Sequence, residues 1–194
     1  GAAGDVIRFV EMFDQMGFKE AVARLSVNGD RLSVAKTKPK EPQPKALTVK
    51  DRKLLDRVVS YYQHTLGEDR RGLNYLKNQR GIAEHQSLKD FGAGYANGTL
   101  LEILPEDEQV MSALKKIGIL NAKGHEVFYN CVVFPLYNAR GSIDNLYGRN
   151  IDDEAGTTHL YLPGERTGLV NRQAVKRSQT IIMTESIIDA LTLY

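Results

Sequence analysis

Two carboxylates, Glu185 and Asp189, are the residues whose type and position best suit chemistry. Glu185 closes the apolar run at residues 180–185, and Asp189 lies four residues further on. In a helix, a spacing of four places two side chains on the same face. A carboxylate at the tip of a buried strand can bind Mg²⁺ through its oxygens or transfer a proton. An acid that caps the following helix fits the pattern equally well, so the pattern alone leaves both interpretations open.

The elements around these acids predict the opening of an α/β unit. Residues 170–178 predict a short helix, residues 180–185 a continuous apolar strand, and residues 186–194 the start of another helix. In sheets of this kind, binding sites lie at the carboxyl ends of strands. Glu185 would then stand at such an end.

A β-rich segment precedes this unit. Residues 126–138 and 142–151 contain many β-branched and aromatic side chains and predict the two strands of a hairpin. Residues 159–164 predict a further short strand that runs into a turn. Pro135 predicts an edge position or a bulge for its strand, because proline cannot donate a ladder hydrogen bond.

Amphipathic helices are predicted before the hairpin. Thr48 followed by Asp51 resembles a capping box and opens a helix that ends near Gly67. Residues 70–98 predict short helices that end at glycines. Residues 106–120 predict a helix with acids in its first turn and lysines near its end, which suits the helix dipole.

The first 53 residues combine two short helical pieces with a basic tether. Residues 6–16 and 19–26 repeat apolar side chains at helical spacing, but about 25 residues make too small a core to stand alone. Eight basic residues then lie between Arg31 and Lys53, and the middle of this stretch has three prolines and few apolar side chains. This composition predicts an extended linker, whose lysines in a second interpretation also contact a nucleic-acid backbone.

Composition excludes several classes of protein. The chain has 194 residues, and its 42% hydrophobic and 26% charged residues are ordinary for a globular protein. No apolar run approaches the roughly 18 residues of a transmembrane helix. One cysteine, Cys131, and four scattered histidines give neither a disulfide framework nor a closed zinc site within this chain. The net charge of +2 is a weak argument for an anionic partner.

Five segments of the chain resemble, in amino-acid sequence and in order, the motifs of one known family. They are residues 4–25, GLNYLKNQRGI with LKDFGAGYA, CVVFPLYNARGSIDNLYGRNI, HLYLPGERTGL and TIIMTESIIDAL. Together they resemble bacterial DnaG-type primases, the RNA polymerases that lay primers on single-stranded DNA. The last segment resembles the first half of the TOPRIM fold. The amino-acid sequences of TIIMTESIIDAL and HLYLPG are closer to those of primase-like proteins of mobile elements than to those of the housekeeping enzyme.

The resemblance implies an α+β fold. A small helical subdomain and a mixed sheet would form the N-terminal part of the primase polymerase domain, followed by the first strand and helix of a TOPRIM α/β fold. In sequence order the implied parts are the tail of a zinc-binding domain at residues 1–27, a basic Pro/Lys linker at 28–47, the N-terminal part of the catalytic core at 48–178, and the start of the TOPRIM domain at 179–194.

The resemblance also assigns roles to four side chains. Glu185 matches the TOPRIM glutamate and is expected to be a catalytic residue and a metal ligand, and Asp189 matches the acid that follows it. Arg140 and Arg149 match basic residues of the hairpin that face the template or the incoming nucleotide. A guanidinium suits this role because it can bind phosphate through two parallel hydrogen bonds.

Some basic positions of the family are changed in this chain. Cys131 and Ala139 stand in the hairpin where the family has basic residues. The side chains expected to compensate as nucleic-acid or nucleotide contacts are Arg166, Lys176 and Arg177.

The function implied by the resemblance is primer synthesis by metal-dependent nucleotidyl transfer. Expected cofactors are Mg²⁺ or Mn²⁺ in the parent protein and Zn²⁺ in a part that precedes residue 1. Expected partners are single-stranded DNA, nucleoside triphosphates and a replicative helicase, with no membrane and a cytoplasmic location. The family's later Asp-x-Asp pair does not occur before Tyr194, so we expect this fragment alone to be inactive.

Two alternatives remain open from the sequence. The chain could be a fragment of another TOPRIM enzyme, a nuclease or topoisomerase, or a non-catalytic DNA-binding module of a mobile element. The hairpin at residues 131–151 favours primase over the other TOPRIM enzymes, because those classes do not need it.

Overall fold

The computed structural model describes residues 17–25, 47–82, 85–154, 156–176 and 178–194. The chain divides into two compact units, residues 1–43 and 44–194. In the first unit, Phe18–Leu25 forms helix α2, close to the helix predicted at 19–26. The helix predicted at residues 6–16 and nearly all of the predicted linker lie outside the described residues.

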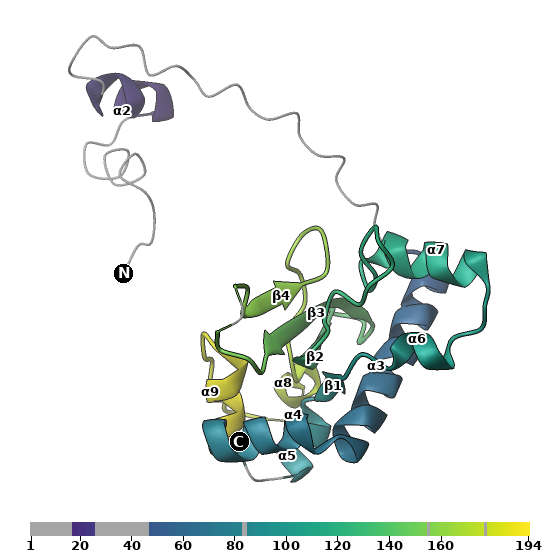
Figure 1. The fold of residues 1–194 in the computed structure, drawn as a ribbon. Helices are drawn as coiled ribbons and strands as arrows, with labels where there is room; N and C mark the ends of the chain where they lie inside the picture. The colour runs from purple at the N-terminus through teal and green to yellow at the C-terminus, as the bar shows by residue number, and fades with distance from the viewer. Residues whose placement is uncertain (1–16, 26–46, 83–84, 155, 177) are drawn as a thin grey trace. The chain divides into compact units, whose positions relative to one another are not determined.

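The second unit combines helices with a four-stranded antiparallel sheet (Figure 1). Its helical elements are α3 (Val49–Glu68), α4 (Arg70–Asn74), the π-helical η1 (Tyr75–Gln79), α5 (His85–Asp90), α6 (Leu100–Ile103), α7 (Glu108–Ile117), α8 (Arg172–Val175) and α9 (Ile187–Thr192). Its strands are β1 (Gly94–Ala96), β2 (Cys131–Tyr137), β3 (Ile143–Asn150) and β4 (His159–Tyr161), paired in this order. The α+β class is therefore confirmed. No helix in the described part of the chain is long and apolar enough to span a membrane.

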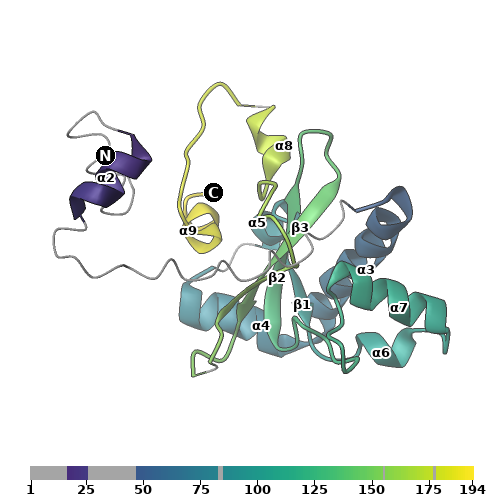
Figure 2. The ribbon, with the colours of Figure 1, turned by 90° about the horizontal axis from the view of Figure 1, so that it is seen from above.

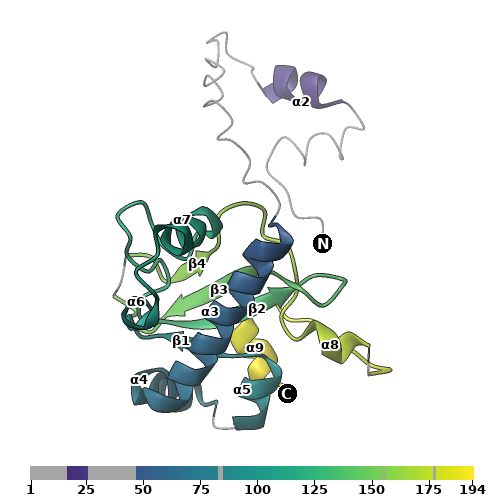
Figure 3. The same ribbon diagram turned by 90° about the vertical axis from the view of Figure 1, so that its right-hand side faces the viewer.

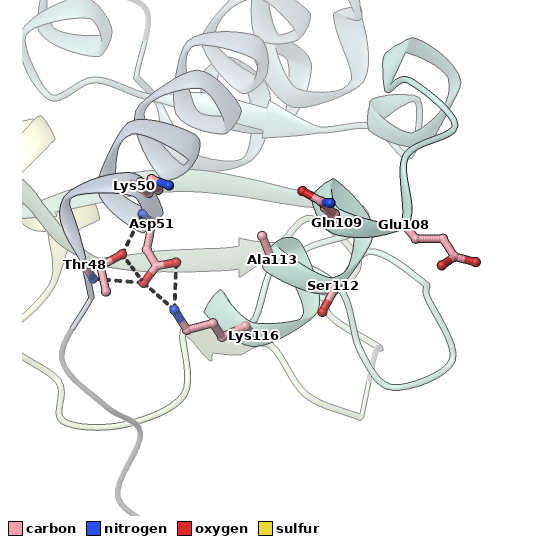
Figure 4. Close-up of a pocket in the computed structure, with 8 residues that line it drawn as sticks. All are labelled: Thr48, Lys50, Asp51, Glu108, Gln109, Ser112, Ala113 and Lys116. Carbon is pink, nitrogen blue, oxygen red and sulfur yellow. Dashed lines mark hydrogen bonds and ion pairs between the residues drawn. The ribbon is translucent and has the colours of Figure 1, made fainter.

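Helix α3 begins where the sequence predicts. The Asp51 N–H donates to the Thr48 hydroxyl at 3.2 Å, and the Thr48 N–H donates to the Asp51 carboxylate at 2.9 Å, which completes a capping box. Lys116 of α7 donates to the same carboxylate at 2.7 Å (Figure 4). Asp51 therefore caps α3 and also ties α7 to it.

The sheet is covered on both faces. Cys131 and Val133 of β2 belong to the core that contains α3 and α7 residues, whereas Val132 belongs to the core formed with η1 and α5. Figure 2 shows α3 and α7 on one side of the sheet and α9 on the other. Residues two apart on a strand share a face. Because Tyr147 belongs to the second core, Arg149 of the same strand also lies on the α9 side.

Strand β1 is an element that the sequence pattern does not predict, since the glycines in and around it, Gly92, Gly94 and Gly98, indicate only the end of a helix. It pairs with residues 131–133 of β2. A Cβ on Gly94 would lie 2.7 Å from the backbone carbonyl carbon of Tyr62 in α3. The missing side chain thus allows β1 to lie directly against α3.

Pro135 departs from the expected edge position. Its strand β2 lies inside the sheet, between β1 and β3, so of the two predicted alternatives, an edge position or a bulge, the edge position is wrong. An irregularity of the kind predicted occurs next to it, between Leu136 and Tyr137. Since β1 pairs only with residues 131–133, Pro135 lies beyond the end of β1, where its missing N–H breaks no bond to that strand.

The strand predicted at residues 180–185 is not formed. Ile181, Ile182 and Met183 are 51%, 68% and 91% exposed, and none of the four described strands pairs with this segment. A strand needs a neighbour to satisfy its backbone N–H and C=O groups. The helix predicted after it is present as α9, and it is capped by Ser186, whose hydroxyl accepts from the N–H groups of Ile188 and Asp189. Glu185 therefore does not serve as the N-cap.

Candidate functional site

A pocket of about 360 Å³ lies on the α9 side of the sheet and gathers side chains from distant parts of the chain. We call it the β3–α9 pocket. It is lined by Arg80, Tyr147, Arg149, His159, Tyr161 and residues 185–189. Arg149, Glu185 and Asp189, which the sequence predicts as site residues, thus come together at one place.

The sheet register explains one wall of the pocket. Tyr147 and Arg149 lie two residues apart on β3, so both face the same side. Across the ladder, Tyr147 pairs with Tyr161 of β4 and Arg149 pairs with His159. Facing pairs of this kind lie within side-chain contact distance. The wall is therefore set by strand pairing, while α9 and the residues before it close the opposite side.

Tyr75 holds two arginines of the pocket. Its hydroxyl oxygen accepts from Nε of Arg80 at 2.7 Å and from Nε of Arg149 at 3.1 Å. The Arg80 guanidinium also lies over the Tyr75 ring, 5.1 Å from its centre, at cation–π distance. Tyr75 itself is only 2% exposed. A buried hydroxyl group thus fixes two cations at the same wall.

Arg149 has two further partners. Its Nη1 lies 2.9 Å from Nε2 of His159, and its Nη2 forms an ion pair with Asp153. A guanidinium can only donate, so Nε2 of His159 accepts here, which assigns the ring proton to Nδ1 and its hydrogen bond to the Tyr147 hydroxyl at 2.8 Å. Burial lowers the pKa of the Arg149 guanidinium, but Tyr75 and Asp153 outweigh this effect and raise the pKa above its usual value. Arg149 is therefore a permanent cation in the pocket.

The other polar groups of the pocket differ in exposure. Burial raises the pKa of Tyr147 to about 12, so its hydroxyl stays protonated at neutral pH. Glu185 and Asp189 are exposed and line the pocket. Within the described residues, no group of three or more His, Cys, Asp or Glu side chains is close enough to hold a metal ion. The two carboxylates that line the pocket, Glu185 and Asp189, are of the type that fits Mg²⁺, which often uses one or two carboxylates together with substrate phosphates.

The remaining predicted basic residues fall outside this pocket. The Arg166 guanidinium lies 4.4 Å from the ring centre of Tyr161, so it stands at the pocket's edge. Arg140 is exposed in the β2–β3 turn. Lys176 lines a second hollow of about 290 Å³, most of whose other lining residues come from that turn and from α8. Figure 3 shows α8 close to the turn that joins β2 and β3. Arg177 lies outside the described residues.

Cys131 does not take the place of a basic contact. It is fully buried in β2, on the face opposite the pocket, and burial raises the pKa of its thiol to about 12. The thiol is therefore uncharged and turned into the core.

Several residues that take part in the site are absent from the sequence-based predictions, among them Tyr75, Arg80, Asp153 and His159. Tyr75 and Arg80 belong to the motif GLNYLKNQRGI, which is the only signal in the sequence that points to them. His159 is the first residue of the segment HLYLPGERTGL and of the short strand predicted at 159–164, whereas Asp153 lies in no predicted element and in none of the five segments. Their part in the site follows from contacts across the fold.

The chain is similar to DNA primases in sequence. The family model described as the DNA primase catalytic core, N-terminal domain, matches residues 61–173, more than half of the chain. The DNA primase of Aquifex aeolicus (strain VF5) is 27% identical over 209 residues, which cover 100% of this chain and 40% of that protein. The chain thus spans about two fifths of the length of this relative.

Solved structures of primases share the fold. The structure of the zinc-binding and RNA polymerase domains of the Aquifex aeolicus primase matches with a TM-score of 0.50 and 27% identity, over 84% of this chain and 40% of that one. A DnaG primase catalytic domain bound to single-stranded DNA matches with a TM-score of 0.51 and 22% identity, over 60% of this chain and 39% of that one. At the latter identity the likeness concerns the fold alone.

Proposed function

Because this chain belongs to the DNA primase family through the N-terminal domain of the primase catalytic core, we propose that it forms part of an enzyme that makes primers on single-stranded DNA by metal-dependent nucleotidyl transfer. The observation that carries the proposal is the β3–α9 pocket. It joins two cations held by a buried hydroxyl with two exposed carboxylates, Glu185 and Asp189. The family match favours primase over the TOPRIM nucleases and topoisomerases.

In this proposal the arginines of the pocket bind phosphate. Arg80 and Arg149 are preorganised by Tyr75, and preorganised donors stabilise developing negative charge without reorganising during the reaction. Glu185 and Asp189 would hold Mg²⁺ or Mn²⁺, which would neutralise phosphate charge and stabilise the attacking and leaving oxygens. The protein side chains themselves orient the nucleotide phosphates.

The single-stranded DNA partner is proposed on the fold likeness to a primase domain bound to such DNA. Arg140 and Lys176, near the hairpin turn, and Arg166, beside Tyr161, are proposed as its phosphate contacts, together with Arg177. The helicase partner, the mobile-element origin, the zinc-binding tail at residues 1–27 and the other domain limits are proposals of the same kind. The matched range 61–173 supports the assignment of residues 48–178 to the catalytic core.

The test is Glu185→Gln in the complete gene product. We expect primer synthesis on single-stranded DNA with Mg²⁺ to be lost, because the carboxylate next to the phosphates is removed, while binding of the DNA stays within about twofold. Glu68→Gln, an exposed acid at the end of α3, is the matched control and should keep both properties. A Glu185→Gln protein that still makes primers would favour the non-catalytic DNA-binding role. The 194-residue chain alone should make none.

A further inference from the structure

Asp153 is the counterion of both pocket arginines. Its Oδ1 lies 3.2 Å from Nη2 of Arg80, and the same oxygen pairs with Nη2 of Arg149. The exposure of the partners differs: the Asp153 side chain is 56% exposed, but that of Arg149 is only 14% exposed. The anion therefore lies at the rim, and the cations lie deeper.

The two arginines do not depend on Asp153 for their position. Tyr75 binds Nε of each guanidinium, and its ring supports Arg80 from one side. His159 supports Nη1 of Arg149. Removal of the carboxylate would leave the arginines held by the Tyr75 hydroxyl, the Tyr75 ring and His159, with the Nη2 groups that bind Asp153 open to another anion.

Asp153, in contrast, is held weakly. It lies in the exposed turn after β3, and within the described residues its carboxylate contacts no group besides Arg80 and Arg149. The carboxylate end of both ion pairs is 56% exposed, so water screens its charge and weakens its hold on the arginines. A turn side chain with two rotatable bonds can leave the arginines without disturbing the strand.

We propose that Asp153 is an exchangeable internal anion: the phosphate oxygens of a ligand displace its carboxylate from Arg80 and Arg149, so that Asp153 sets the affinity of the pocket for phosphate. Carboxylate and phosphate oxygens bind the guanidinium fork in the same way. The inference rests on the proposed function in one respect, since it takes nucleotide phosphates as the ligand of the β3–α9 pocket.

Competition between the Asp153 carboxylate and an incoming anion also determines which class of anion the pocket binds. A tethered carboxylate is present at a high effective concentration beside its partners, so a singly charged free anion displaces it poorly. A polyphosphate carries several charges and can bind both guanidiniums at once. The pocket should therefore prefer pyrophosphate or a nucleoside triphosphate to acetate or chloride.

The experiment is calorimetric titration of the 194-residue chain and its variants with inorganic pyrophosphate and with ATP. Asp153→Asn removes the competing charge, and Asp152→Asn changes the net charge equally at the neighbouring residue. Asp152 is a suitable control because its Oδ1 accepts from the Glu154 N–H at 3.0 Å, a bond that asparagine can keep. We expect Asp153→Asn to bind pyrophosphate about three- to tenfold more tightly than Asp152→Asn does.

Equal or weaker binding by Asp153→Asn than by Asp152→Asn would overturn the inference, and weaker binding would show that Asp153 positions the arginines. Asp153→Ser, checked by thermal unfolding, repeats the comparison with a different side chain.

Arg149→Ala separates the inference about Asp153 from the proposed function. If it leaves pyrophosphate and ATP binding unchanged, the pocket is not a phosphate site and the proposed function fails. If it weakens binding but Asp153→Asn gives no gain, only the inference about Asp153 fails.

Discussion

A single buried oxygen, the Tyr75 hydroxyl, organises the cations of the pocket. It accepts from both Arg80 and Arg149, and the residue carrying it is almost fully buried. Guanidinium groups held in this way lose little further freedom when they bind phosphate, which is the condition for tight binding. The same oxygen explains how two residues 69 positions apart, Arg80 and Arg149, come together at one wall of the pocket.

Tyr75→Phe should therefore weaken pyrophosphate binding by about tenfold or more, because hydrogen bonds to charged groups contribute about 1.5–3 kcal/mol. The ring and its packing are kept, so the fold should persist, as circular dichroism can confirm. Tyr61→Phe is the control, since its hydroxyl bonds to Thr99 at 2.6 Å, away from the pocket. Affinities by calorimetry decide the matter: if the Tyr75 and Tyr61 variants bind alike, Tyr75 does not position the arginines.

At the scale of residues, type and spacing single out the two acids of the pocket, and the resemblance to primases adds one arginine. Glu185, Asp189 and Arg149 lie in segments whose wording resembles the primase family, and the structure brings all three to one pocket. Asp153 lies in no such segment, and an acid in a turn is usually solvated. Tyr75 does lie in one, but nothing in the segment marks it as a site residue, because a tyrosine in a helix is usually a core residue. Their role depends on contacts between segments that local patterns do not connect.

At the scale of elements, the joint between α3 and α7 depends on one carboxylate. Asp51 caps α3 with Thr48 and accepts two hydrogen bonds from Lys116, at 2.7 and 3.0 Å (Figure 4). The bond from Lys116, followed by the backbone bond from Thr48, lowers the pKa of Asp51 from 3.8 to about 2. The joint fixes the beginning of the helix that covers one face of the sheet.

This pKa gives a prediction for stability. A carboxyl whose pKa is lower in the folded state stabilises the fold above its unfolded pKa of 3.8 and loses that contribution as the pH falls through about 2. Asp51→Asn should lower the free energy of unfolding by about 1–2 kcal/mol near pH 6, a range that allows for the half-exposed Lys116. Near pH 2 the variant and the wild type should converge. Urea unfolding at both pH values measures this, and a gap that persists at low pH would assign the loss to packing instead.

The elements themselves are predicted to different degrees. Helices α3 and α7 follow from an amphipathic period with clear caps, and β2 and β3 from their β-branched and aromatic runs. Strand β1 is not predictable from such patterns, because its glycine serves a close approach to α3 rather than a turn. At residues 180–185 the composition favours a strand, but pairing is a property of neighbours, and none of the described strands lies beside it.

At the scale of the whole molecule, acidic and basic residues nearly balance to a net charge of +2, but basic side chains gather at two places. One group lies in the β3–α9 pocket around Arg80 and Arg149. A second lies at the hairpin turn, where Arg140 is exposed in the turn and Lys176 lines the hollow beside α8. If single-stranded DNA follows the proposed path, the pocket group binds nucleotide phosphate and the hairpin group binds the strand.

The salt dependence of DNA binding tests this division of roles. For single strands, the slope of log affinity against log salt changes by about 0.7 for each phosphate that a cation neutralises. Arg140→Ala and Lys176→Ala should each make the slope shallower by about this amount and leave pyrophosphate binding to the pocket unchanged. Lys115→Ala, on α7 across the sheet, is the matched control and should alter neither. Fluorescence anisotropy with a short single-stranded oligonucleotide over a range of salt gives the slopes. If Lys115→Ala changes the slope as much as Arg140→Ala does, the DNA binds through diffuse charge and follows no path along the hairpin.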